Sequence, residues 1–125
     1  MEDPQGLGSL PTAVGGVPVT RPIPMGPCLA LLRSFEPDHP TPQQAIATAA
    51  DSVEQVFADV LPDINDGQFA ALIDLTIWKG ADFLAASPIA AWIQGGNFAL
   101  PPGALAALGS RGKAELDVWL LGNSL

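Results

Sequence analysis

The chain has 125 residues, of which 48 % are hydrophobic and 14 % charged, and its formal net charge is −8. This length suits one domain with a core, and the single cysteine excludes an internal disulfide. Because only five residues are Lys or Arg, the chain lacks the clustered cations that bind nucleic acid or anionic membranes. Neither is therefore expected as a partner.

The first 27 residues are predicted to form an extended N-terminal arm. They contain six prolines and five glycines, which disfavour a helix because proline removes a hydrogen-bond donor and glycine costs backbone entropy. Seven apolar residues lie between them, and contact with another surface would remove these side chains from water. They are Leu7, Leu10, Val14, Val17, Val19, Ile23 and Met25. We expect this arm to lie on another protein surface. The alternative is a tail that packs on nothing.

Residues 28–125 are predicted to form one helical domain. A short helix is expected over residues 28–35, and the proline-rich residues 37–40 form a turn after it. Thr41 is a good N-cap for the next helix, and Gln44 completes a capping box. This helix is expected to continue to Pro62, because its apolar stripe has helical spacing. The stripe consists of Val53, Val56, Phe57, Val60 and Leu61.

The third helix is expected to be the buried centre of the domain. It begins near Asn65 or Asp66 and ends at Gly80. Its apolar residues cover nearly the whole circumference, which is typical of a helix surrounded by others. They are Phe69, Leu72, Ile73, Leu75, Ile77 and Trp78.

The rest of the chain is predicted to be helical as well. A turn over residues 82–86 leads to a helix that begins at Ser87 and ends before Gly95. A brief helix over residues 104–108 precedes the last one, from Ser110 to Gly122. No β-hairpin signal occurs outside the arm, so the expected fold class is all-α. Proline and glycine interrupt the long uncharged stretch, so no membrane span is expected.

Several motifs, in order along residues 29–122, resemble the phage-type lysozymes (endolysin muramidases). Each resembles a start, core or end of a helix in that family. They are TPQQA at 41–45, QFAALIDL at 68–75 followed by Gly80, SPI at 87–89, IQGG at 93–96, and SRGKAEL at 110–116 with Trp119. The resemblance implies a lysozyme-like helical domain around the buried central helix.

The same resemblance makes Glu36 the one catalytic candidate. The run LLRSFE at 31–36 resembles the helix end that carries the family's general acid, with Pro37 in place of a glycine. The family continues through a β-hairpin subdomain whose Asp and Thr position water, whereas here four residues separate Glu36 from Thr41. Glycoside hydrolysis ordinarily needs two carboxylates, and Asp38 is too close along the chain to replace the missing one. The hairpin is therefore expected to be deleted and the chain to be inactive.

Other residues that suggest chemistry have simpler explanations. Asp38 and His39 are too few ligands for a metal site, and Cys28 has no base to activate it. Neither a metal nor a cofactor is expected. Trp92 and Trp119 are predicted to be core or interface residues rather than sugar platforms.

Asp74 is the one charge within the apolar third helix. A salt bridge to Lys79 or Arg111 would account for it, because a buried charge needs a partner.

A lysozyme-like domain without its cleft, joined to an apolar arm, suggests reuse as a scaffold. We expect a non-catalytic structural component of a phage or phage-like particle, a virion protein assembled in the host cytoplasm, whose arm binds neighbouring subunits. Two alternatives remain open. One is a module that binds peptidoglycan without cutting it, and the other is a divergent muramidase with Glu36 as the acid and a partner chain completing the site.

Overall fold

Helices dominate the described part of the chain, which comprises residues 22–96 and 104–122 of a computed structural model, and no strand occurs there. The prediction of an all-α fold is confirmed for these residues. The expected arm lies outside them over residues 1–21. The elements are α1 (Met25–Phe35), α2 (Pro42–Val56), α3 (Asp66–Lys79), α4 (Ala81–Ala86), α5 (Pro88–Gln94) and α6 (Ser110–Leu121), with short 3-10 helices η2 (Leu61–Asp63) and η3 (Ala106–Leu108).

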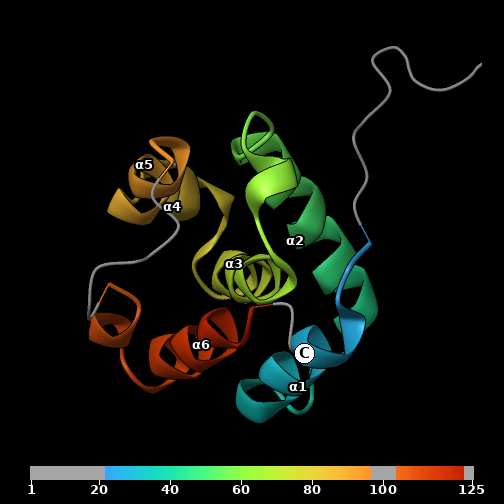
Figure 1. Cartoon of the computed structure of the whole chain (residues 1–125). Coiled ribbons are helices and arrows are strands. Elements are labelled where there is room, and N and C mark those ends of the chain that lie inside the picture. Colours follow the sequence, from blue (N-terminus) through green and yellow to red (C-terminus); the bar gives the residue numbers. More distant parts are fainter. Residues whose placement is uncertain (1–21, 97–103, 123–125) are drawn as a thin grey trace, which may run out of the picture.

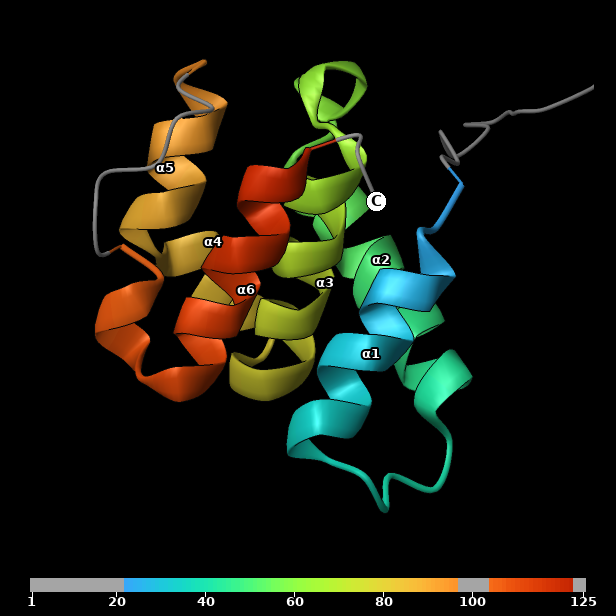
Figure 2. The ribbon, with the colours of Figure 1, turned by 60° about the horizontal axis from the view of Figure 1, so that its bottom comes forward.

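Helix α3 occupies the centre of the domain, as predicted. Figure 1 shows it end-on, with α1 and α2 on one side and α4, α5 and α6 on the other, and Figure 2 shows the same arrangement from below. Every residue from 67 to 76 is buried. The helix begins at a capping box in which Asn65 and Gln68 exchange hydrogen bonds of 2.8 and 2.9 Å. It ends at Gly80, whose φ of 96° favours glycine.

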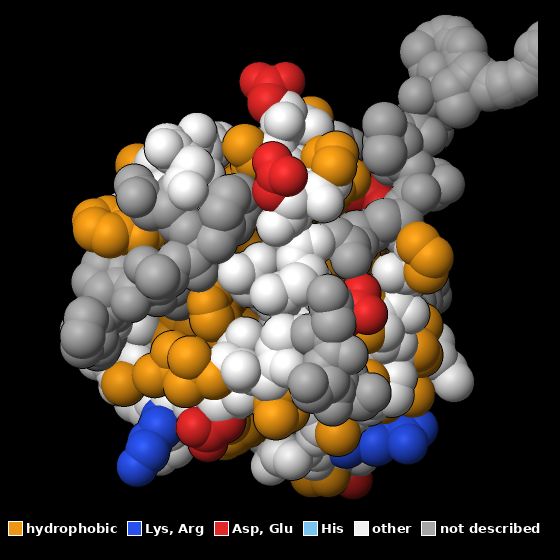
Figure 3. Space-filling view, viewed as in Figure 1, with side chains coloured by type: hydrophobic (Ala, Val, Ile, Leu, Met, Phe, Trp, Pro, Cys, Tyr) orange, Lys and Arg blue, Asp and Glu red, His pale blue; other side chains and the backbone are white. Residues whose placement is uncertain are grey.

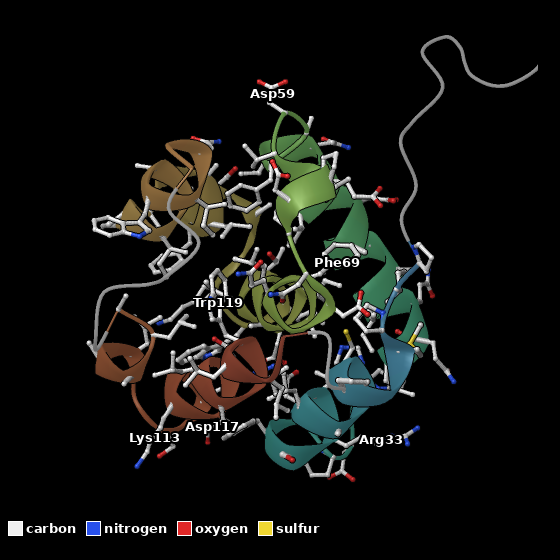
Figure 4. The ribbon with its side chains drawn as sticks, in the orientation of Figure 1. Arg33, Asp59, Phe69, Lys113, Asp117 and Trp119 are labelled. Atoms are coloured by element: carbon white, nitrogen blue, oxygen red, sulfur yellow. The ribbon has the colours of Figure 1, made fainter. Side chains whose placement is uncertain are left out.

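Most of the apolar residues that helical spacing predicted to be buried lie in the core. Val53, Phe57 and Leu61 of the predicted stripe are buried. Cys28 is buried as a small core residue, as expected. Trp119 is also buried, and Figure 4 shows its side chain between α6 and α3. Trp92 is different, because 40 % of it is exposed.

Helix α1 begins earlier than the sequence indicated. The prediction that residues 1–27 contain no helix is wrong for the last three, because α1 starts at Met25 rather than Cys28. Proline is tolerated in the first turn of a helix, where the backbone N–H groups have no partner within the helix. Pro27 lies in this turn, and an added Cβ at Gly26 would meet nothing within 4 Å. The helical domain therefore takes in residues 25–27.

The boundaries of α2 also differ from the prediction. Thr41 precedes the helix, but its side chain makes no capping hydrogen bond. Instead its backbone N–H donates to His39 Nδ1 at 3.2 Å. The helix ends at Val56, and a turn joins it to η2, which contains Pro62. The apolar stripe continues through this turn, so its spacing did not reveal the break.

The prediction of a turn over residues 82–86 is also wrong, because these residues belong to helix α4. Leu84 is the one buried residue of this helix. So short a helix carries no apolar repeat that could predict it. The expected Ser87 cap is present, since its hydroxyl accepts a hydrogen bond from Ala90 N at 3.2 Å. The brief helix expected over residues 104–108 is the shorter η3.

Candidate functional site

Glu36 lies directly after α1, in the turn that leads to α2. Its backbone N–H donates to Leu32 O at 2.7 Å, which ends the helix, and its carbonyl accepts from His39 N at 3.1 Å. The turn connects the two helices without any other element between them. The position that resembles a catalytic acid therefore sits on a short helix-to-helix connection.

Arg111 on α6 joins Glu36 to Asp74 on α3. Its Nη1 donates to Glu36 Oε2 at 2.6 Å, while its Nε and Nη2 donate to the two carboxylate oxygens of Asp74 at 2.9 and 3.0 Å. This confirms Arg111, and not Lys79, as the salt-bridge partner of Asp74. Burial alone would lower the pKa of Arg111, but the hydrogen bonds to Asp74 and Glu36 outweigh it and raise the pKa. All three guanidinium nitrogens thus donate to one or other of these two carboxylates.

Glu115 on α6 is an ionisable residue that lies next to Asp74 and Arg111. It is completely buried, and neither carboxyl oxygen has a hydrogen-bond partner among the described residues. Burial, and then the neighbouring Asp74, raise the pKa of Glu115 to about 10. Glu115 is therefore protonated at neutral pH. We call Glu36, Asp74, Arg111 and Glu115 the arginine cluster.

Aromatic rings and cations alternate at the outer edge of the arginine cluster. The Arg111 guanidinium carbon lies 5.5 Å from the ring centre of Phe35 and 5.7 Å from that of Trp78. Lys79 Nζ lies 4.5 Å from the Trp78 ring and 5.6 Å from the Phe83 ring. These are cation–π distances. They connect α1, α3, α4 and α6 across one surface.

The chemistry open to the arginine cluster is narrow. The Glu36 side chain is 35 % exposed, but it accepts a short charged hydrogen bond from Arg111. Asp74 and Glu115 are buried, so a substrate has no route to either carboxyl group. Within residues 22–96 and 104–122, no group of three or more His, Cys, Asp and Glu side chains could hold a metal ion. A hydrogen-bonded network of this kind typically holds helices together.

A separate open groove of about 580 Å³ lies between α2 and the end of α3. Its polar lining residues carry hydroxyl, amide or imidazole groups rather than carboxylates or amines. They are His39, Thr41, Gln44, Thr48, Ser52 and Thr76. The Thr76 hydroxyl already donates to Leu72 O at 2.8 Å. The volume falls in the range of small-molecule sites.

Comparison of the chain with protein-family models, curated proteins and solved structures found no match. The likeness to phage-type lysozymes therefore rests on the sequence motifs alone. In the part of the chain that the structure describes, none of the helices combines the length and apolar character needed to cross a membrane.

The sequence revealed only part of the arginine cluster. Asp74 was visible as a charge within an apolar helix, and Arg111 was one of its two expected partners. The bond between Arg111 and Glu36 was not predicted, because 75 residues separate them. Glu115 was missed as a buried acid. One signal was present: it follows Arg111 by four residues, so both lie on one face of α6.

Proposed function

We propose that this chain is a non-catalytic structural component of a phage or phage-like particle, built on a reduced lysozyme-like domain. The observation that carries the non-catalytic part is the bond between Arg111 and Glu36. It ties the position of the family's acid to Asp74, and the turn after Glu36 leads straight into α2. Asp74 is buried and Asp38 lies two residues from Glu36 in the same turn, which supports the absence of a second carboxylate placed across a sugar ring. The resemblance in the sequence motifs supports the assignment to a particle.

The surface supports a role in assembly. Charged residues are scarce at 14 % of the chain, and several large apolar side chains are open to solvent. Leu120 is 72 % exposed and Leu121 50 % exposed. Exposed apolar surface of this kind marks sites that other proteins cover. Figure 3 shows hydrophobic side chains reaching the surface along the lower edge of the domain, between the few Lys and Arg side chains.

Quantitative mass spectrometry of purified particles tests this function. We expect the chain at a fixed stoichiometry relative to a known particle protein, unchanged by a high-salt wash. Its absence from particles made by cells that express it would overturn the proposal. A chain that lacks residues 1–21 should keep its helical circular dichroism but fail to join the particle. The cut is placed there because α1 begins at Met25.

A second candidate function is binding of peptidoglycan without hydrolysis. The groove of about 580 Å³ between α2 and α3 favours it, because its uncharged hydroxyl and amide lining suits a sugar or amide ligand. Sedimentation with purified cell walls tests this candidate. Thr48→Trp would fill the groove, whereas Ala47→Trp changes an exposed neighbour on the same helix that does not line it. Cell-wall binding that only Thr48→Trp removes would establish this function.

A further inference from the structure

An apolar groove of about 470 Å³ opens between α1 and α6. Six of its eight lining residues are apolar: Pro27, Ala30, Leu31, Ala114, Val118 and Leu121. The Ser34 hydroxyl is already used, because it donates to Ala30 O at 2.8 Å. Asp117 is the one charged residue of the lining, and Figure 4 shows it at the lower edge of the domain.

The shape of the groove suits one extended strand of chain. Its lining residues on α1 run from Pro27 to Ser34, seven steps along the helix. At about 1.5 Å per residue this is roughly 10 Å. Three or four residues of extended chain, at about 3.3 Å each, cover that length.

The chain supplies a segment of matching chemistry. Residues 4–20 contain no Asp, Glu, Lys, Arg or His, and prolines stand at 4, 11 and 18. Proline removes backbone donors and favours the polyproline II conformation, whose backbone stays solvated. A proline-containing run can place apolar side chains in a helix-lined groove without a sheet edge, and its proline reduces the entropy that it loses on binding. The run Val17-Pro18-Val19 has this character.

The path of the chain favours a groove on another copy. Figures 1 and 2 both show residues 22–24 on the α2 side of α1, whereas the groove lies on the α6 side. A segment that left the domain there would have to reverse around α1 to reach its own groove. Val19 lies three residues before Pro22, a tether of roughly 10 Å at about 3.3 Å per residue, so the receiving groove would belong to a copy packed directly against this side of the domain.

We propose that the α1–α6 groove binds the run Val17-Pro18-Val19 of a second copy of this chain. Two copies that exchange segments reciprocally would form a closed pair, whereas one-way contacts would generate a ring or an open array. This inference rests on the proposed function in one respect, that the N-terminal segment joins subunits, and it names the surface that receives it.

Disulfide trapping in the full chain tests the contact. Val17→Cys with Ser34→Cys should give disulfide-linked dimers and larger species on a non-reducing gel after mild oxidation. The matched control, Val17→Cys with Ala47→Cys, places the second thiol on an exposed part of α2 outside the groove and should stay mostly uncrosslinked. Cys28 does not compete, because it is buried and burial, with Asp74 beside it, raises the pKa of its thiol to about 12.

A disulfide within one chain would overturn the proposal, because the groove would then hold the chain's own segment. Equal crosslinking of both pairs would overturn it too, since contact would not be specific to the groove.

Sedimentation equilibrium supplies a second, independent measurement. The full chain should self-associate, and Ala30→Arg should raise the dissociation constant by about tenfold or more, because it puts a charge into the apolar lining. Ala47→Arg should leave the constant unchanged. Val17→Asp in the segment should weaken association as Ala30→Arg does. Association that survives Val17→Asp, or a chain that is monomeric at all concentrations, would overturn the inference.

The proposed function would survive that failure if the chain still co-purifies with particles, because the N-terminal segment would then bind a different subunit. Self-association without particle incorporation would give the opposite pattern, so the two proposals fail separately.

Discussion

Arg111 of α6 donates two hydrogen bonds, at 2.9 and 3.0 Å, to the buried carboxylate of Asp74 on α3. The pair fastens the last helix of the domain to its central helix. A paired charge of this kind contributes little net stability, but removal of one partner leaves the other buried and uncompensated.

We expect Arg111→Met to lower the free energy of unfolding by roughly 3–5 kcal/mol, because Asp74 would remain as a buried charge without a partner. Chemical denaturation followed by circular dichroism measures this. Arg33→Met is the control: Arg33 is exposed on α1, so its loss should stay within about 0.5 kcal/mol. Equal effects from the two substitutions would contradict the central role of the pair.

Glu115→Gln should stabilise the domain above mildly acidic pH. The pKa of Glu115 rises from 4.5 to about 10 on folding, through burial and then Asp74. The folded chain thus binds a proton that the unfolded chain releases, and stability falls as pH rises from about 4.5 to about 10. A neutral amide removes this slope. At pH 7 the gain should be on the order of 1–3 kcal/mol, and near pH 4 the two proteins should be similar. Denaturation midpoints of both proteins across this pH range test the prediction. A difference between the two that does not change with pH would refute it.

Gly112 is required where η3 and α6 approach closely. A Cβ at this position would overlap the carbonyl oxygen of Leu105, and a backbone atom cannot move aside as a side chain can. Gly112→Ala should therefore cost about 1–3 kcal/mol. Gly26→Ala is the matched control, because nothing lies within 4 Å of its added Cβ in α1. It should gain about 0.5–1 kcal/mol from the better helix former. A comparison of melting curves that ranks the two variants the other way would contradict this account.

Sequence spacing predicted the parts of the fold that repeat along the chain or have local signals. The all-round apolar pattern identified α3 as the centre, and Asn65, Gln68 and Gly80 set its ends through bonds within a few residues. The end of α2 was missed because Phe57 and Leu61 stay buried on both sides of a turn. Helix α4 was missed because one buried residue makes no repeat.

The candidate site was predictable to a smaller extent. Glu36 and Asp74 stood out individually, the first by resemblance and the second as a charge in an apolar helix. Their connection through Arg111 depends on how α1, α3 and α6 pack, which no local pattern contains. The raised pKa of Glu115 likewise results from burial by distant elements.

Leu72→Ala in α3 should lower the free energy of unfolding by roughly 2–5 kcal/mol, because Leu72 is 1 % exposed at the centre of the domain. The lost contacts leave a cavity that the surrounding helices cannot close. Leu120→Ala provides the control, since Leu120 is 72 % exposed and should change stability by less than about 0.5 kcal/mol. A loss below about 1 kcal/mol for Leu72→Ala in urea denaturation would mean that α3 is not the core.

The purified chain should not hydrolyse peptidoglycan. Glu36 accepts the 2.6 Å hydrogen bond from Arg111, whereas a general acid must present a proton to the glycosidic oxygen. Asp74 and Glu115 are buried and cannot supply the second carboxylate. A turbidity assay on cells with permeabilised outer membranes, beside an active phage endolysin, measures the activity. We expect no clearing by the chain, and none by Glu36→Gln. Clearing by the chain that disappears in Glu36→Gln would show that Arg111 releases Glu36 and that a second group, from a partner or from outside the described residues, completes the site.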